Sequence, residues 1–415
     1  MSRRARACFH VLAKPAGPLC NLACGYCFYL DKRGLFPAPG RLRMADAVLE
    51  AFTRQYLAAQ PPGTREVQFS WQGGEPTLMG LSFFRRALGL QRRYARPGIR
   101  IANALQTNGT LLDDEWGRFL REHEFLVGIS VDGPQALHDA WRRDSRGRGS
   151  FRAVMRGVEV LRRHGVAFNT LTVVHGRNGS RAREVYDFLT QIGSTFLQFI
   201  PLVEPAPGGG VSERSVAPQQ YGRFLARVFD AWLEAGHVGS VFVREFETIL
   251  GLLAGGPAGL CVHAEACGRA LALEHDGQVF ACDHFVDGEH RLGSVLEEGL
   301  AALVDGERQT AFGTAKRRAL PAACLACAWL PLCRGGCPKD RLARSPDGET
   351  GLNHLCAGYR LFFEHSVPVF EAMARCLHAG RPAADFALLA PQAVGRNAPC
   401  PCGSGRKHKR CCLRA

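Results

Sequence analysis

Strand-like and helix-like stretches alternate along the N-terminal half of the chain, and no other feature constrains the fold as much. The strand-like runs are C-F-H-V-L-A-K, V-Q-F-S-W-Q, I-R-I-A-N-A-L-Q-T, F-L-V-G-I-S-V, F-N-T-L-T-V-V and F-L-Q-F-I-P-L-V. Segments of helical period lie between them, at residues 44–60, 82–94, 113–122, 151–164 and 180–192. Because right-handed crossovers join such units into a parallel sheet, the sequence predicts an α/β fold, closed or partly closed as a barrel.

Residues suited to chemistry follow the predicted strands. Cysteines at 20–27 come after the first strand, G-G-E-P at 73–76 after the second, T-N-G at 107–109 after the third and D-G-P at 132–134 after the fourth. The carboxyl ends of parallel strands meet at one mouth of such a barrel. We therefore expect these loops to assemble one site.

The pattern changes after residue 201, where P-A-P-G-G-G reads as a loop and a helical stretch follows at 218–235. A cysteine-rich region and a basic tail come next. The sequence predicts a barrel domain at 1–235, a cysteine-rich domain at 236–375, a linker at 376–395 and a separate tail at 396–415.

Composition favours a metal-binding protein of the cytoplasm. The N-terminal apolar run ends at Lys14 and Pro15, which predicts neither a secretory signal nor a membrane span. In a reducing compartment, 17 cysteines argue for metal ligation rather than disulfides. The net charge of +14 is spread mostly over the predicted helices, where it indicates solvated outer faces.

The first cysteine group has one ligand too few for a closed metal site. Cys20, Cys24 and Cys27 form C-x3-C-x2-C, whereas structural zinc sites and inert clusters take four protein ligands. Three thiolates can hold three irons of a cubane [4Fe-4S] cluster and leave the fourth iron open to an outside ligand. Three incidental core cysteines are the alternative.

This spacing, with Tyr26 beside the last cysteine, resembles the radical S-adenosylmethionine superfamily. In that family the methionine part of S-adenosyl-L-methionine chelates the open iron, and one electron cleaves the sulfonium to a 5'-deoxyadenosyl radical. The resemblance implies a partial (β/α)6 TIM-like barrel. It assigns cofactor binding to Tyr26, Gly73, Gly74, Glu75, Ser130 and Arg142, with Glu75 toward the amino group and Ser130 and Arg142 toward the ribose and carboxylate.

Eight further cysteines lie between residues 261 and 356, spaced as C-x5-C, one alone, C-x2-C-x5-C-x3-C and one alone. Asp276-Gly277 predicts a hairpin turn among them. Eight thiolates suffice for two four-cysteine clusters, and zinc is the other possibility for C-x2-C-x5-C.

This layout resembles the SPASM extension of radical S-adenosylmethionine enzymes. The resemblance implies two auxiliary [4Fe-4S] clusters, and hence three in total. One would be held by Cys261, Cys267, Cys282 and Cys337. The other would be held by Cys324, Cys327, Cys333 and Cys356.

Within that group the chain resembles the anaerobic sulfatase-maturating enzymes over about residues 8 to 375. The motifs are C-x3-C-x-Y-C-F-Y, S-W-Q-G-G-E-P-T-L, Q-T-N-G-T-L, S-V-D-G-P-x3-H-D-x2-R, F-A-C-D-H-F and C-x2-C-x5-C-R-G-G-C-P-K-D-R. The resemblance implies oxidation of a cysteine or serine of a sulfatase polypeptide to formylglycine. It makes Asp283 the general base, places Tyr29 and Gln72 at the target peptide, and implies a low-potential electron donor such as flavodoxin or ferredoxin.

Asp283 poses a problem of proton affinity. An aspartate near pKa 3.9 lies about 4.6 units below a thiol near 8.5, which is roughly 6 kcal/mol against proton transfer. Either burial beside an anionic cluster raises the Asp283 pKa, or radical formation acidifies the substrate first.

The tail carries Cys400, Cys402, Cys411 and Cys412 as C-x-C-x8-C-C and resembles the SEC-C motif, a zinc knuckle that binds other proteins. We expect one Zn²⁺ there. Its basic charge suggests contact with the ribosome or a secretion chaperone. Cys8 and Cys376 remain as predicted core residues.

Two other functions stay open on the sequence alone. A SPASM maturase forming thioether or carbon–carbon crosslinks in a ribosomal peptide would use the same scaffold. An iron–sulfur electron carrier or zinc-tailed nucleic-acid-binding protein would use the cysteines without the open iron.

Overall fold

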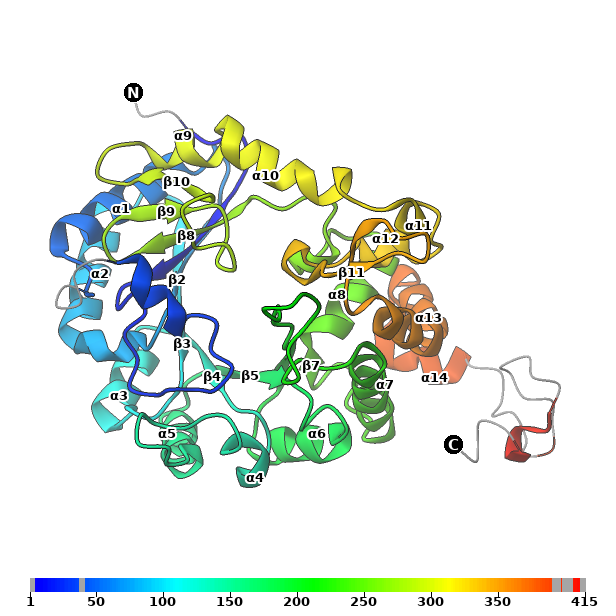
Figure 1. The fold of residues 1–415 in the computed structure, drawn as a ribbon. Helices are drawn as coiled ribbons and strands as arrows, with labels where there is room; N and C mark the ends of the chain where they lie inside the picture. The colour runs from blue at the N-terminus through cyan, green and yellow to red at the C-terminus, as the bar shows by residue number, and fades with distance from the viewer. Residues whose placement is uncertain (1–3, 37–41, 390–396, 398–405, 411–415) are drawn as a thin grey trace.

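A single sheet of ten strands organises the molecule (Figure 1). The computed structural model describes residues 4–36, 42–389, 397 and 406–410. The sheet order is β10-β9-β8-β1-β2-β3-β4-β5-β6-β7. Its strands are β1 His10–Lys14, β2 Glu66–Trp71, β3 Arg100–Thr107, β4 Leu126–Ser130, β5 Phe168–Val174, β6 Phe196–Pro201, β7 Phe242–Val243, β8 Ala270–Glu274, β9 Gln278–Phe280 and β10 Arg291–Ser294.

Strands β1 to β7 run parallel, each hydrogen-bonded to the next in sequence. Helices connect them and surround the sheet on its outer side (Figure 1). They are α1 Asp46–Ala59, α2 Gly80–Tyr94, α3 Asp114–Glu122, α4 Gln135–His138, α5 Phe151–Arg163 and α6 Ala182–Gln191. All six predicted strands and five predicted helices are present within a few residues of their expected bounds.

The sheet is not closed, and within the described chain β7 and β10 form its two edges. This confirms the partial barrel. Strand β8 pairs in parallel with β1, and the β8–β9 hairpin turns at Gly277, whose φ is +91°. Both β7 and β8 lie beyond residue 235, so the two predicted domains share one sheet.

The C-terminal region adds mostly helices. They are α7 Pro218–Glu234, α8 Arg244–Leu253, α9 Leu300–Val304, α10 Glu307–Arg318, α11 Ala322–Leu325, α12 Leu330–Cys333, α13 Cys356–His378 and α14 Phe386–Leu389. Short 3-10 helices are η1 Leu30–Leu35, η3 Pro76–Met79, η4 Cys261–His263, η5 Pro338–Asp340, η6 Ala383–Asp385 and η7 His408–Arg410, and β11 Ala343–Arg344 pairs with β12 Thr350–Leu352. None of the helices described is both long and apolar enough to cross a bilayer.

Two predictions for isolated cysteines have different outcomes. Cys376 is fully buried in α13, which confirms it as a core residue. Cys8 is exposed and precedes β1, so its placement inside a strand and in the core was wrong. The strand starts at His10 because that is the first residue in register with β8.

Helices α7 and α13 approach each other through two glycines. A Cβ on Gly222 would lie 2.3 Å from the carbonyl oxygen of Gly358, and one on Gly358 would lie 2.1 Å from that of Pro218. Since these neighbours are backbone atoms, they cannot move aside as a side chain would. This crossing fixes α13, whose first residue is the predicted cluster ligand Cys356.

We predict that Gly358→Ala lowers stability by about 1–3 kcal/mol, the usual cost of overpacking a tight contact. Gly251→Ala is the matched control, because Gly251 also lies in a helix but a Cβ there meets nothing within 4 Å. The control should gain up to about 1 kcal/mol. Urea unfolding followed by circular dichroism measures both, and equal midpoints for the two variants would contradict the close crossing.

Candidate active site

The three-cysteine loop follows β1 and is held against the segment after β4. The N–H of Ala23 donates to the carbonyl of Arg143 over 2.7 Å, and that of Gly25 to Trp141 over 3.0 Å. A Cβ on Gly25 would lie 2.8 Å from the Trp141 ring, so this approach requires glycine. The predicted convergence of loops at one end of the sheet is therefore realised.

The thiols of this loop lie close enough to influence one another. Burial raises the pKa of Cys20 to about 11 and that of Cys24 to about 12, and negative charge on Cys27 adds to both shifts. Such thiols become ligands when a metal displaces their protons. Side chains in the described ranges do not form a set tight enough for a single metal ion, whereas each thiolate of a cubane binds its own iron. Three thiols on one loop match the number that such a cluster would need, and the cluster itself stays a prediction.

The glycines of G-G-E-P allow this segment to lie against the cysteine loop. Gly74 donates its N–H to Gly17 over 2.8 Å, and Glu75 donates its N–H to Leu19 over 2.8 Å. A Cβ on Gly74 would lie 2.1 Å from the Leu19 carbonyl oxygen, and Gly73 has φ +122°. Both positions thus require glycine because of the neighbouring loop.

Glu75 is completely buried and ties together two strand-end loops. Its carboxylate accepts the hydroxyl of Thr107 at 2.7 Å and the backbone N–H of Asn108 at 2.7 Å. The hydroxyl and N–H of Thr77 also donate to it, at 2.6 and 3.0 Å. Burial raises the pKa of Glu75, and these hydrogen bonds oppose the shift. Its contact with a cofactor amino group stays a prediction.

Arg142 is buried beside the three-cysteine loop and pairs with Asp132, the first residue of the D-G-P segment that follows β4. Its Nε donates to Asp132 over 2.9 Å, and the Tyr26 hydroxyl donates to the same oxygen. Arg142 also lies 5.5 Å from the Tyr26 ring centroid and favours the thiolate of Cys24. The predicted cofactor residues Tyr26 and Arg142 are therefore together.

His138 supports this pair as a neutral imidazole. Its Nδ1 accepts the N–H of Asp132 at 3.4 Å, and its Nε2 lies 3.0 Å from the Ser150 hydroxyl. Burial lowers the pKa of His138 to about 4. Ser130, another predicted cofactor residue, ends β4 and accepts a hydrogen bond from Gln106 at 3.1 Å.

Three residues predicted to act on the substrate meet beside β1. Gln72 donates through Nε2 to Asp283 over 3.3 Å, although 211 positions separate them. The ammonium of Lys14 forms an ion pair with the other carboxylate oxygen of Asp283 and lies 3.6 Å from the Tyr29 ring centroid. Tyr29 packs with Cys27 in one apolar cluster, which places this group next to the cluster loop.

Burial would raise the pKa of Asp283, but Lys14 opposes this most strongly and holds it below the ordinary value. His284 and the hydrogen bond from Gln72 act in the same direction. Of the two solutions considered from the sequence, these side chains do not supply the raised pKa. An ionised Asp283 fits the second solution, in which the substrate is acidified first.

Lys14 and Glu274 are site residues that sequence reasoning missed. Lys14 ends β1 with its side chain 1% exposed, and Glu274 ends β8 directly opposite it. Glu274 is fully buried and accepts the hydroxyl of Tyr29. A charged residue closing an apolar strand was the available signal in both cases, because such a side chain needs a partner at the strand end.

The eight later cysteines fall into two groups by their mutual influence. Negative charge on Cys261 raises the pKa of Cys267, Cys282 and Cys337. Negative charge on Cys327 raises that of Cys324, Cys333 and Cys356. Burial is the largest cause in all six. The two groups have the same members as the ligand sets that the SPASM resemblance implied, and cluster binding by them stays a prediction.

Tail residues Cys400, Cys402, Cys411 and Cys412 lie outside the described residues.

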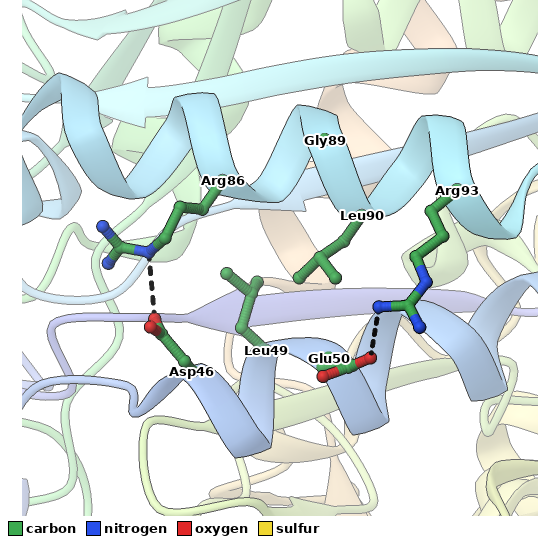
Figure 2. A pocket seen from close by; sticks show the side chains of 7 residues that line it. All are labelled: Asp46, Leu49, Glu50, Arg86, Gly89, Leu90 and Arg93. Atoms are coloured by element: carbon green, nitrogen blue, oxygen red, sulfur yellow. Dashed lines mark hydrogen bonds and ion pairs between the residues drawn. The ribbon is translucent and has the colours of Figure 1, made fainter.

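A cavity of about 330 Å³ between α1 and α2 lies on the outer helical layer (Figure 2). Arg86 and Arg93 pair across it with Asp46 and Glu50, at 3.0 and 3.2 Å. It contains no predicted site residue and belongs to helix packing.

Three family models match the chain: "Radical SAM superfamily" over residues 15–189, "Iron-sulfur cluster-binding domain" over 261–328 and "SEC-C motif" over 396–414. A serine-type anaerobic sulfatase-maturating enzyme of Bacteroides thetaiotaomicron is 41% identical, covering 88% of this chain and 91% of that protein. A cysteine-type enzyme of Clostridium perfringens is 35% identical over 86% and 96%.

Solved structures are similar to this chain over most of its length. One described as "Native anSMEcpe with bound AdoMet and Cp18Cys peptide" superposes with a TM-score of 0.80 at 34% identity, covering 89% of this chain and 99% of that chain. Streptococcus suis SuiB bound to precursor peptide SuiA gives 0.60 at 16% identity over 84% and 76%, which shows a shared fold alone.

The open parallel sheet, the three-cysteine loop at its mouth and the eight-cysteine extension define a radical S-adenosylmethionine enzyme with a SPASM domain. S-adenosylmethionine and iron–sulfur clusters are the cofactors of this class. The chain belongs to the anaerobic sulfatase-maturating enzymes.

We predict that Lys14→Met costs about 3–5 kcal/mol of stability, because it leaves Asp283 buried and unpaired. The double variant Lys14→Met/Asp283→Asn should be more stable than Lys14→Met. Thermal midpoints of the two single variants and the double variant form a cycle. Additive effects would mean that the ion pair does not couple the two residues.

Proposed function

We propose that the protein oxidises a cysteine or serine side chain of a sulfatase polypeptide to formylglycine, with Asp283 as the base. The observation that carries this is the meeting of Tyr29, Gln72 and Asp283 beside Cys27. Membership of the family supplies the reaction, and the group of residues supplies a place for it. The alternative of peptide crosslinking rests on a shared fold alone.

Three [4Fe-4S] clusters fit the cysteine groups described above. The loop with Cys20, Cys24 and Cys27 would hold the cluster that binds S-adenosylmethionine. The auxiliary clusters would take two sets of four: Cys261, Cys267, Cys282 and Cys337, and Cys324, Cys327, Cys333 and Cys356. When bound, the cluster and S-adenosylmethionine supply an alkyl radical that removes a hydrogen atom from the substrate β carbon.

The chain's own residues then handle the proton. After the hydrogen atom leaves, one proton and one electron must still depart from the substrate to give the aldehyde from serine or the thioaldehyde from cysteine. Water then hydrolyses the thioaldehyde to the aldehyde and releases hydrogen sulfide. Asp283 is ionised by Lys14 and can accept that proton. Gln72 fixes one carboxylate oxygen and Lys14 the other, so the base is held in a defined orientation.

Arg142 would bind the carboxylate of S-adenosylmethionine. Asp132 accepts the hydrogen bond from its Nε, and within the described chain no hydrogen bond engages its two terminal nitrogens. Guanidinium nitrogens of this kind suit a carboxylate. Gly73, Gly74 and Glu75 would border the methionine amino group, and Ser130 the ribose. Tyr26 would border the cofactor from the cysteine loop.

Partners are proposed by the same reasoning. A low-potential carrier such as flavodoxin or ferredoxin would supply the electron that starts the reaction.

We propose that the tail binds one zinc ion through Cys400, Cys402, Cys411 and Cys412, which the SEC-C match supports. Contact of this tail with the ribosome or a secretion chaperone would bring the enzyme to sulfatases before export. Loss of zinc on deleting 396–415, with unchanged iron, tests the metal assignment.

We predict that Asp283→Asn forms deoxyadenosine but at least tenfold less aldehyde, because an amide cannot accept the proton. The assay is mass spectrometry of C-x-P-x-R and S-x-P-x-R peptides after anaerobic incubation with reconstituted enzyme, S-adenosylmethionine and dithionite. Which peptide reacts faster decides the target residue.

Asp287→Asn is the matched control, because Asp287 is a more exposed neighbour that pairs with His290 at 2.8 Å. It should retain aldehyde formation. Full aldehyde formation by Asp283→Asn would remove Asp283 from its role as base, and wild-type enzyme that forms deoxyadenosine without changing either peptide would overturn the proposed function.

A further inference from the structure

Two cations, Lys316 and Arg341, lie among the eight cysteines of the C-terminal region, and neither has a carboxylate partner among the described residues. Lys316 is 1% exposed, and Arg341 is partly buried. Every hydrogen bond seen for their side chains, in the part of the chain that is described, goes to a backbone carbonyl. Buried charges normally pair with an opposite charge. Near Lys316 and Arg341 the chain supplies cysteine thiols in place of carboxylates.

The fold fixes both cations in place. Arg341 donates to the carbonyls of Lys316 at 2.7 Å, Gly335 at 3.2 Å and Arg334 at 3.5 Å. Arg334, Gly335 and Gly336 all have positive φ, of 50°, 72° and 62°. This left-handed run lies between Cys333 and Cys337, one cysteine from each group.

Lys316 connects the same arrangement to the loop that starts at Cys261. Its ammonium donates to the carbonyls of Cys261 at 2.6 Å and Val262 at 3.0 Å, and also to that of Ala264. Arg341 donates a hydrogen bond to the backbone carbonyl of Lys316, so the contacts of the two cations are continuous. These contacts connect the segments that carry the two cysteine groups.

The charges of the two cations reach different thiols. Arg341 contacts the carbonyls of Arg334 and Gly335, between one cysteine of each group, and the causes of its lowered pKa agree: burial lowers it, while Cys324, Cys267, Cys337 and Cys333 oppose the shift. Burial likewise lowers the pKa of Lys316, which faces Cys267, Cys261 and Cys337 of one group alone.

We propose that Arg341 and Lys316 set the reduction potentials of the auxiliary clusters, making them able to accept the electron that leaves the substrate. This rests on the proposed function. A cluster that gains one electron gains one negative charge, and a fixed positive charge nearby stabilises that reduced form. The electron is the one that the substrate radical loses while the proton of its thiol or hydroxyl group goes to Asp283, which leaves a carbon–sulfur or carbon–oxygen double bond, so charge and atoms balance.

The test is a potentiometric titration of the reconstituted full-length enzyme, followed by electron paramagnetic resonance without peptide. Arg341→Gln should lower both auxiliary potentials by at least the equivalent of a tenfold change in the reduction equilibrium, about 59 mV for one electron. Lys316→Gln should lower only the potential of the cluster near Cys261. Arg341→Lys should restore much of the shift.

Arg318→Gln is the matched control, because Arg318 is exposed and lies two residues from Lys316 in the same helix. It removes the same charge and should leave all potentials unchanged. Unchanged potentials in iron-loaded Arg341→Gln would overturn the proposal. If both Arg341→Gln and Lys316→Gln lose auxiliary iron, the cations serve cluster retention, and the proposal is overturned as well.

The measured potentials test the tuning role of the two cations separately from the proposed reaction. The potentials are measured with no peptide present, so they do not depend on which substrate is oxidised. Shifted potentials in an enzyme that makes no aldehyde would leave the tuning role standing and remove the proposed function. Normal aldehyde formation with unshifted potentials would remove the tuning role and leave the proposed function standing.

Discussion

The parallel pairing of β8 with β1 is the contact on which the rest of the site depends. It makes the first strand of the barrel an interior strand, bordered by β2 on one side and by the C-terminal hairpin on the other. The register places Lys14 opposite Glu274. Cys282 and Asp283 are thereby carried to the mouth of the barrel, next to the loop that follows β1.

The structure repeatedly places a cation beside a group that carries, or can carry, negative charge. Three cations each lie beside groups that are or can become anionic: the buried Arg142 beside Asp132, the buried Lys14 beside Asp283, and the partly buried Arg341 among cysteines. In the first two cases the partner is a carboxylate of the chain. In the third the partner is a group of thiols that become anionic on binding iron. The same electrostatic rule would thus shape the proposed cofactor binding, base ionisation and electron acceptance.

Much of the fold could be predicted because its signals are local. Short apolar runs separated by helical periods specified the strands, and Asp276-Gly277 specified the hairpin. The open edges were harder to foresee, since β7 has only two residues and no pattern of its own. Cys8 was misplaced because an apolar neighbourhood does not fix where a strand begins. Only pairing with β8 does so.

By itself, the sequence determined the chemistry available to this protein. C-x3-C-x2-C with too few ligands for a closed site, eight further cysteines and an aspartate after one of them set the class of reaction. The tertiary structure decided which residues act together. Lys14 and Asp283 are 269 positions apart, and no spacing rule relates them. Their contact exists because two strands far apart in the sequence pair in register, and a buried charge at the end of one strand is stable only beside its counterpart.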